Sequence, residues 1–213
     1  MNWQVIPLPA VVPIPWRNGG GITREMLAFP DAENWIWRIS VAEVASDGAF
    51  SYFPGVQRWL AILSGAGVRL SMDAEVIELT ERSAPLAFSG ATAVHCNLLH
   101  GPVQDLNLML RAGPNLKQAN VGQMRRIFGK QRFVIDAAKT VAIYSANAPA
   151  VLQLNGVRFV LSESALAWQS LPACAELVIA ATSAILMVIA LEIENVPSAP
   201  DVATELLQRF VCR

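Results

Sequence analysis

The sequence predicts a mainly β protein built from two small β-barrels or sandwiches in one chain. Short apolar or alternating runs, bounded by Gly, Pro, Asn, Asp and Ser, recur throughout with the period of two that is typical of strands. Few longer stretches keep a helical period. Each half also carries a tight hairpin signal. The runs that define the pattern are 35–44, 58–72, 103–111, 132–146 and 150–162.

Two turn sequences indicate the hairpins and a division of the chain. Asn155-Gly156 stands between two strand-like runs, and both central residues of a type I′ turn need positive φ. The "SGAG" of 64–67 is predicted to close a second hairpin. The polar segment 111–131 interrupts the strand pattern. We therefore expect an N-terminal domain over 1–115 and a C-terminal domain over 116–213, with a single large sandwich as the alternative.

Two segments need separate interpretation. Residues 177–191 are uncharged over 15 residues, whereas a membrane-spanning helix needs about 18 or more apolar residues. Thr182-Ser183 in the middle of this run predicts a turn between two buried strands. Near the C-terminus, "PDVATELLQRF" (200–210) fits a short helix with Asp201 as its N-cap.

Composition argues against several classes of function. With 54% hydrophobic residues and a net charge of -1, the chain can form a large core but offers no basic field for nucleic acid or anionic lipid. Three widely spaced cysteines and an N-terminus without a basic region indicate neither a disulfide framework nor a signal peptide, so we expect a cytoplasmic protein. The mean hydropathy of +0.40 is compatible with a homodimer.

The run 35–44 places an arginine on a dry strand face. Arginine is rarely buried without a partner, so Arg38 needs an anion. The partner is either an internal carboxylate, Glu25 or Glu43, or a ligand carboxylate held by both arms of the guanidinium. Alternation assigns Trp35, Trp37, Ile39 and Val41 to one face, and Ile36, Arg38, Ser40, Ala42 and Val44 to the other.

Two further strands carry polar groups among apolar ones. In 103–111, Asp105 and Asn107 share a face with Met109 and Arg111, which either lines a pocket or faces solvent. Arg58 begins the apolar run "RWLAIL". It either caps a cavity at a barrel mouth or lies on the surface with its stem on a neighbour.

The sequence gives little support for a metal site or for nucleophilic catalysis. His95 and His100 are the only histidines, and their separation places them on opposite faces of a strand. We therefore expect no metal, no cofactor and no catalytic triad. The glycines 19–21 form neither a phosphate-binding loop nor a dinucleotide fingerprint. They either let the backbone approach a ligand or permit a tight crossing between strands.

Several uncommon strings, taken in order, closely resemble the HutD/Ves family. They are "WRNGGGITREM" (16–26), the segment 35–70, "FSG" (88–90) and "DLNLMLR" (105–111); the second half is similar only in general pattern. The resemblance implies a bicupin, two jelly-roll-like barrels with few short helices. It also implies a protein encoded beside histidine-utilisation genes that tunes the pathway by binding an intermediate, with N-formylglutamate the candidate.

The resemblance also bears on the chemistry of the site. Where a metal-binding cupin has His-x-His and then Glu, the corresponding places here look like Ser51, Phe53 and Arg58, and the later His is replaced near Asn107. This implies a site that binds an anion and no metal. The segment 16–25 would then run along the mouth, with its glycines flat against the pocket and Asn18 and Glu25 turned inward.

We therefore expect a metal-free bicupin that binds a small, dicarboxylate-like anionic metabolite, with two arginines supplying charge and neighbouring polar groups supplying hydrogen bonds. One alternative is a metal-independent isomerase or amide hydrolase with Glu25 or Asp105 as general base. Another is a protein-interaction module. The expected ligand-binding residues are Trp16, Asn18, Glu25, Arg38, Ser40, Arg58, Asp105 and Asn107.

Overall fold

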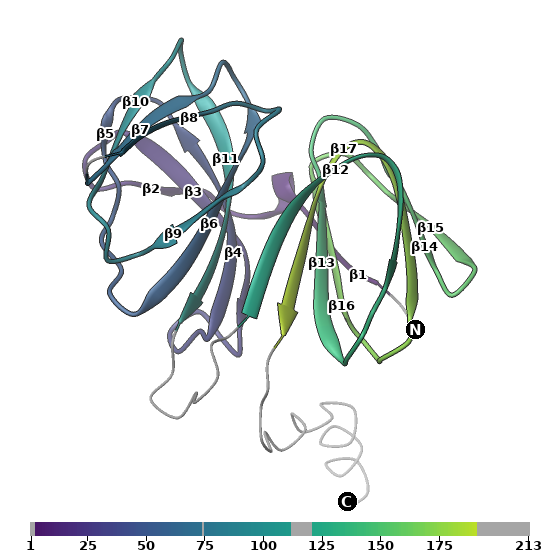
Figure 1. Cartoon of the computed structure of the whole chain (residues 1–213). Helices are drawn as coiled ribbons and strands as arrows, with labels where there is room; N and C mark the ends of the chain where they lie inside the picture. The colour runs from purple at the N-terminus through teal and green to yellow at the C-terminus, as the bar shows by residue number, and fades with distance from the viewer. Residues whose placement is uncertain (1–2, 74, 112–120, 191–213) are drawn as a thin grey trace, which may run out of the picture.

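The computed structural model describes residues 3–73, 75–111 and 121–190, and most of them lie in antiparallel strands. The strands form two lobes that lie side by side (Figure 1). The first lobe contains a six-stranded and a four-stranded sheet, and the second contains a seven-stranded sheet. The prediction of a mainly β fold is confirmed.

The first lobe is built from β2 to β11. Its six-stranded sheet has the order β2 (Ile14–Pro15), β3 (Gly21–Phe29), β4 (Trp37–Val44), β11 (Val103–Arg111), β6 (Val56–Ser64) and β9 (Leu86–Ser89). Its four-stranded sheet has the order β5 (Gly48–Ala49), β10 (Val94–Leu98), β7 (Val68–Met72) and β8 (Glu75–Leu79).

The second lobe takes one strand from the N-terminal end of the chain. Its sheet has the order β1 (Gln4–Pro7), β16 (Ala165–Leu171), β13 (Lys139–Ser145), β17 (Glu176–Ala190), β14 (Ala150–Leu154) and β15 (Val157–Leu161), with β12 (Val121–Val134) also paired to β17. After β1, the 3-10 helix η1 (Leu8–Ala10) leads into the first lobe. The predicted boundary near residue 115 falls outside the described residues, so the two domain ranges stay a prediction.

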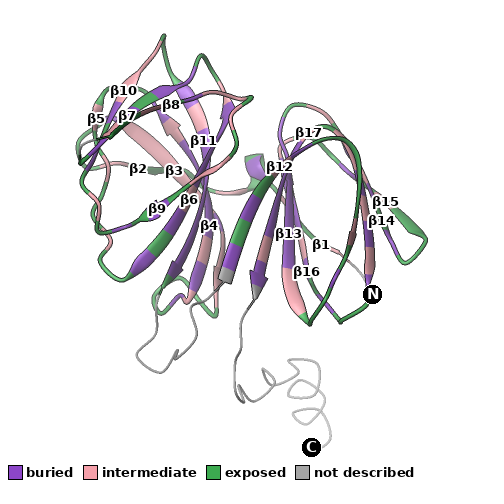
Figure 2. Ribbon diagram, in the orientation of Figure 1, coloured by how far each residue is buried: buried purple, intermediate pink, exposed green. Residues whose placement is uncertain are grey.

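A shared apolar core joins the lobes. Trp37 and Ile39 of β4 belong to one buried cluster with Tyr144 and Met187 of the second lobe. Trp37 stacks on Phe29 at 5.6 Å between ring centroids and meets Trp168 edge-on at 6.2 Å. Buried residues run along β4, β13 and β17 between the lobes, while the β15 hairpin is exposed (Figure 2). Trp37, Ile39 and Val41 of the predicted apolar face therefore hold the second lobe. The prediction was wrong for Trp35, which precedes β4 and packs with Val56 and Met109 in a separate cluster, because the alternation of a strand does not extend beyond its end.

One predicted hairpin is confirmed and the other is wrong. Asn155 and Gly156 have φ of 47° and 85° and connect the paired strands β14 and β15. The turn at 64–67 also reverses the chain, but β6 pairs with β11 and β9, whereas β7 pairs with β10 and β8. This turn passes the chain from one sheet to the other. A turn sequence predicts a reversal without specifying which strands pair.

The apolar run 177–191 forms one strand where two were predicted. β17 is continuous, pairing with β14 in its first half and with β13 in its second. Thr182 and Ser183 lie at an irregularity in its pairing with β12, so the strand accommodates them without turning. Residues 121–131, predicted to interrupt the strand pattern, lie within β12.

Two points about helices remain, the predicted helix near the C-terminus and the question of a membrane-spanning helix. The predicted helix at 200–210 lies outside the described residues. No helix within the described part of the chain has the length and apolar character needed to cross a bilayer.

The glycine run belongs to the hairpin that joins β2 to β3. Gly19 has a φ of 72°, and its N–H donates to the Trp16 carbonyl at 3.0 Å. A Cβ on Gly21 would lie 2.3 Å from the backbone oxygen of Glu43. Close approach between β3 and β4 thus requires glycine here, and a tight strand crossing accounts for this position.

Gly21→Ala should lower the free energy of unfolding by about 1–3 kcal/mol, because an added methyl group forces the packed backbone apart. Urea unfolding followed by tryptophan fluorescence measures the change. Gly48→Ala is the matched control, since its Cβ would meet only the Asn18 amide nitrogen, at 4.0 Å. Equal losses in the two variants would contradict the tight crossing.

Candidate functional site

A cavity of about 710 Å³ lies in the first lobe, on the inner face of the six-stranded sheet. Its size is within the range of small-molecule sites, about 300–1,000 Å³. β4, β6 and β11 supply its polar floor, and the segments 14–18 and 49–53 supply further walls. The cavity therefore lies on the face that alternation predicted for Arg38 and Asp105.

The pairing of three strands brings the predicted residues together. Met109 of β11 lies opposite Arg38 of β4 on one side and opposite Arg58 of β6 on the other. Neighbouring strands are about 4.8 Å apart, so the two arginine backbones are separated by about 10 Å. Two residues before Met109 on β11, Asn107 lies opposite Ser40. Residues distant in sequence thus form a compact grid on one sheet face.

Arg58 is a buried cation with neutral partners. Its side chain donates from Nη2 to Asn107 Oδ1 at 3.0 Å and from Nη1 to the Ser51 carbonyl at 3.3 Å, while Nε has no hydrogen-bond partner. None of the ion pairs among the described residues includes Arg58. Burial lowers its pKa to about 10, with Asp105 opposing the shift, so the guanidinium stays charged at neutral pH. The alternative of a surface arginine is wrong.

Three aromatic rings surround this guanidinium. The ring centroids of Phe88, Phe50 and Phe53 lie 5.0, 5.5 and 5.6 Å from its Cζ atom. Ring faces attract a cation and exclude water, so they partly replace the hydration that Arg58 has lost. These phenylalanines were missing from the predicted site. Only the resemblance of Ser51 and Phe53 to cupin ligand positions pointed toward this segment.

Asp105 is completely enclosed beside Arg58 and Asn107. It is 2% exposed, and its Oδ1 accepts a hydrogen bond from Asn107 Nδ2 at 2.6 Å. Burial raises its pKa to about 7, against the opposing effects of Arg58 and of the Asn107 hydrogen bond. The alternative of a solvated face for 103–111 is therefore wrong.

The Asn107 amide connects Arg58 with Asp105. A guanidinium can only donate, so the Asn107 amide oxygen must face Arg58, and its nitrogen then faces Asp105. The amide is held in one orientation by this arrangement. Asp105 thereby positions the acceptor that holds the Arg58 guanidinium.

Arg38 has the internal carboxylate partner that the sequence left open. Its Nε lies 3.4 Å from Glu25 Oε2, outside hydrogen-bond geometry, and its Cζ lies 5.8 Å from the Trp35 ring. Glu43, the other candidate, pairs with Arg24. Arg38 also lines the cavity. From this position it can contact a ligand while it stays paired with Glu25.

All predicted site residues except Glu25 line the cavity. Trp16 Nε1 donates to Thr23 Oγ1 at 2.8 Å, and Asn18 Oδ1 accepts from the Gly20 N–H at 3.0 Å. Ser40 is buried and lies opposite Asn107 of β11 and Glu25 of β3. Glycines 19–21, which were expected to lie flat against the pocket, are not among its lining residues.

The donor set does not resemble a metal centre. Among the described residues no group of three or more His, Cys, Asp or Glu side chains could hold a metal ion. His95 and His100 are exposed, and Asp105 has amide and guanidinium neighbours. The cavity offers cations and amides, which are groups that bind anions.

Comparison with solved structures agrees with the fold. The chain superposes on the cupin 2 conserved barrel domain protein from Leptotrichia buccalis with a TM-score of 0.54, covering 88% of this chain and 96% of that one at 9% identity. At this identity the similarity concerns the fold alone. The antiparallel sheets thus define a mainly β protein with a cupin-like fold.

The sequence comparisons identify the family within this class. The HutD family profile matches residues 9–187. An uncharacterized 21.2 kDa protein in the hutC 3′ region of Pseudomonas putida is 32% identical over 145 residues, covering 67% of this chain and 73% of that protein. Protein Ves of Citrobacter koseri is 41% identical over 98 residues, covering 45% of this chain and 51% of that protein.

A solved structure supports the same assignment. HutD from Pseudomonas fluorescens SBW25 superposes with a TM-score of 0.73 at 27% identity, covering 89% of this chain and all of that one. The chain belongs to the HutD/Ves family. The family predicted from the sequence motifs is confirmed.

Asp105→Asn should change how stability depends on pH. Because the folded state keeps the proton of Asp105 up to about pH 7 while the unfolded chain loses it near 3.8, wild-type stability falls as pH rises through this window. The slope from this group is at most about 1.4 kcal/mol per pH unit. Asparagine does not titrate and still offers Asn107 an oxygen acceptor.

The unfolding free energy of the variant minus that of the wild type should therefore increase from about pH 4 to about pH 7 and then level off. Urea unfolding of both proteins at pH steps across this range measures the difference. Parallel stability profiles would show that Asp105 does not titrate in this way.

Proposed function

We propose that this protein binds a small, dicarboxylate-like anionic metabolite in the cavity of the first lobe, without a metal or cofactor. The observation that carries the proposal is Arg58, a cation only 5% exposed with neutral hydrogen-bond partners and an unpartnered Nε. Asp105 lies near Arg58 but forms no ion pair with it, and a buried charge without an ion-pair partner is costly. A ligand carboxylate would compensate it.

The second arginine supports a ligand with two acidic ends. Arg38 lies on the same cross-strand row as Arg58, about two strand spacings away. A second carboxylate reaching Arg38 would share it with Glu25. Ser40 and Asn18 line the space and can hydrogen-bond an amide. N-formylglutamate, with two carboxylates and a formamide, has this set of groups.

The comparisons support a role in histidine utilisation. The Pseudomonas putida relative is named for its position in the hutC 3′ region, and the Pseudomonas fluorescens relative is itself a HutD. We infer that the protein acts in the cytoplasm as a modulator of this pathway and senses an intermediate. We further interpret the second lobe as the second barrel of a bicupin, and we propose a homodimer as the assembly.

A metal-independent enzyme is the second candidate, and one observation favours it. Asp105 lines the cavity with a pKa raised by burial to about 7. A general acid or base works best when its pKa lies near the working pH. An isomerase or amide hydrolase would use Asp105 on the same ligand. Turnover separates the two candidates.

Arg38→Ala and Arg58→Ala are each expected to weaken N-formylglutamate binding by about 2 kcal/mol or more, roughly 30-fold, because each removes a charge-assisted contact from a dry site. Isothermal titration calorimetry measures the affinity, and circular dichroism checks folding. Arg58→Lys keeps the charge without the planar fork and should lose affinity even if the alanine variant is unstable. Arg69→Ala is the control, since Arg69 is exposed and paired with Glu78.

Proton NMR of the same samples follows the fate of the ligand. Unchanged ligand in the presence of wild-type protein supports binding without catalysis, whereas conversion supports the enzyme. Full affinity in both arginine-to-alanine variants would rule out this cavity. If no intermediate of histidine degradation binds, the proposed function is wrong and the protein-interaction alternative is favoured.

A further inference from the structure

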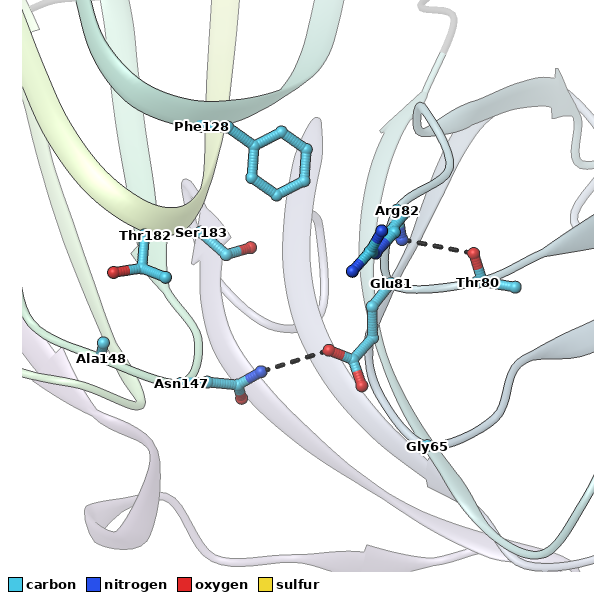
Figure 3. A pocket seen from close by; sticks show the side chains of 9 residues that line it. All are labelled: Gly65, Thr80, Glu81, Arg82, Phe128, Asn147, Ala148, Thr182 and Ser183. Atoms are coloured by element: carbon cyan, nitrogen blue, oxygen red, sulfur yellow. Dashed lines mark hydrogen bonds between the residues drawn. The ribbon is translucent and has the colours of Figure 1, made fainter.

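A second cavity, of about 480 Å³, lies at the junction of the lobes and shares no lining residue with the first. We call it the inter-lobe cavity. Glu81 and Arg82 line it from the first lobe, and Phe128, Asn147, Thr182 and Ser183 line it from the second (Figure 3). Its volume also falls within the usual range for small ligands, about 300–1,000 Å³.

A strand irregularity forms the wall on the side of the second lobe. Ile127 pairs with Ala184 and Gly129 with Ala181, so Phe128 alone lies opposite both Thr182 and Ser183. Such bulges re-aim side chains and are frequent beside functional sites. Phe128 is 48% exposed, and its ring projects over the cavity on the side facing Arg82 (Figure 3). The irregularity thus places the Phe128 ring and the Ser183 hydroxyl on the same side, with Thr182 beside them (Figure 3).

The opposite wall is the loop 80–83, which hydrogen bonds hold in place. Thr80 N–H donates to Ser83 Oγ at 3.0 Å, and Arg82 N–H donates to Thr80 Oγ1 at 3.3 Å. From the second lobe, Arg126 donates to the carbonyls of Ser83 at 3.0 Å and Ile62 at 2.6 Å. A ligand would therefore meet a preformed wall and pay little for ordering it.

The polar groups facing the cavity have unused bonding capacity. Within the described ranges, no ion pair or side-chain hydrogen bond engages the Arg82 guanidinium or the hydroxyls of Thr182 and Ser183. The Glu81 carboxylate has one long contact, 3.5 Å from Asn147 Nδ2. Arg126 also lies near Glu81, but two of its nitrogens donate to backbone carbonyls.

We propose that the inter-lobe cavity is a second small-molecule site, which binds a zwitterionic α-amino acid with a planar side chain. Arg82 binds the carboxylate, Glu81 binds the ammonium group, and Phe128 packs against the ring. One cation and one anion on neighbouring residues match the two opposite charges of such a ligand. The site uses different residues from the first cavity, so this proposal does not rest on the function proposed there.

The test compares amino acids with analogues that lack one end. By calorimetry, at least one of L-phenylalanine, L-tyrosine, L-tryptophan and L-histidine should bind. For L-phenylalanine as ligand, 3-phenylpropionate lacks the ammonium group and phenethylamine lacks the carboxylate. Each analogue should bind about tenfold more weakly or worse, the scale for losing a charge-assisted contact. The analogues of any other binding amino acid serve in the same way.

Variants then assign each end to its residue. Glu81→Gln should abolish the preference for the amino acid over the analogue without the ammonium group, and Arg82→Gln should abolish the preference over the analogue without the carboxylate. Phe128→Leu should weaken binding of the amino acid itself. Arg69→Ala should change neither preference. Circular dichroism confirms that the variants, all altered at solvent-accessible positions, remain folded.

Several outcomes would overturn the proposal. These are no binding of any of the four amino acids at millimolar concentration, unchanged preferences in both charge variants, or displacement of the amino acid by saturating N-formylglutamate. The last outcome would place the amino acid in the first cavity. Failure of N-formylglutamate to bind, with the amino acid still bound, would count against the proposed function alone.

Discussion

The six-stranded sheet of the first lobe separates two chemistries that cannot mix, and the alternation of side chains along β4 and β11 maintains that separation. One face carries Trp37 and Leu108 into the core shared with the second lobe. The other carries Arg38 and Asn107 into the cavity. Because the period of a strand is two, a register shift by one residue would place guanidinium groups in the apolar core. The same strand register therefore determines both the packing between the lobes and the lining of the cavity.

On the cavity side, the chain keeps a charge that its own residues only partly balance. Arg58 is held by neutral oxygen acceptors and by three phenylalanine rings. Asp105 is near, but burial favours its protonated form, and Asn107 stands between the two side chains. Such an arrangement stabilises the guanidinium without giving it a full counter-charge. An anion entering the cavity would find a preorganised partner that has already lost its water.

Side-chain hydrogen bonds cross the junction between the lobes in addition to the shared apolar core. Arg126 and Asn147 cross it to hold backbone carbonyls at the end of β6 and in the loop after β8. β6 also carries Arg58. The same strand thus connects the first cavity with the wall of the inter-lobe cavity. The strand irregularity at Phe128 is a local departure from regular pairing beside the inter-lobe cavity.

Local pattern by itself determined the strand faces at 37–44 and 103–111, the Asn155-Gly156 hairpin and, through its motifs, the family. These features depend on neighbours within a few residues, where alternation and turn chemistry act directly. Only the tertiary structure decided that Glu25 pairs with Arg38, that three phenylalanine rings enclose Arg58, and that the turn at 64–67 connects two sheets. These outcomes depend on strand pairing across the whole chain, and pairing is selected by the combined burial of many residues, which no short segment encodes.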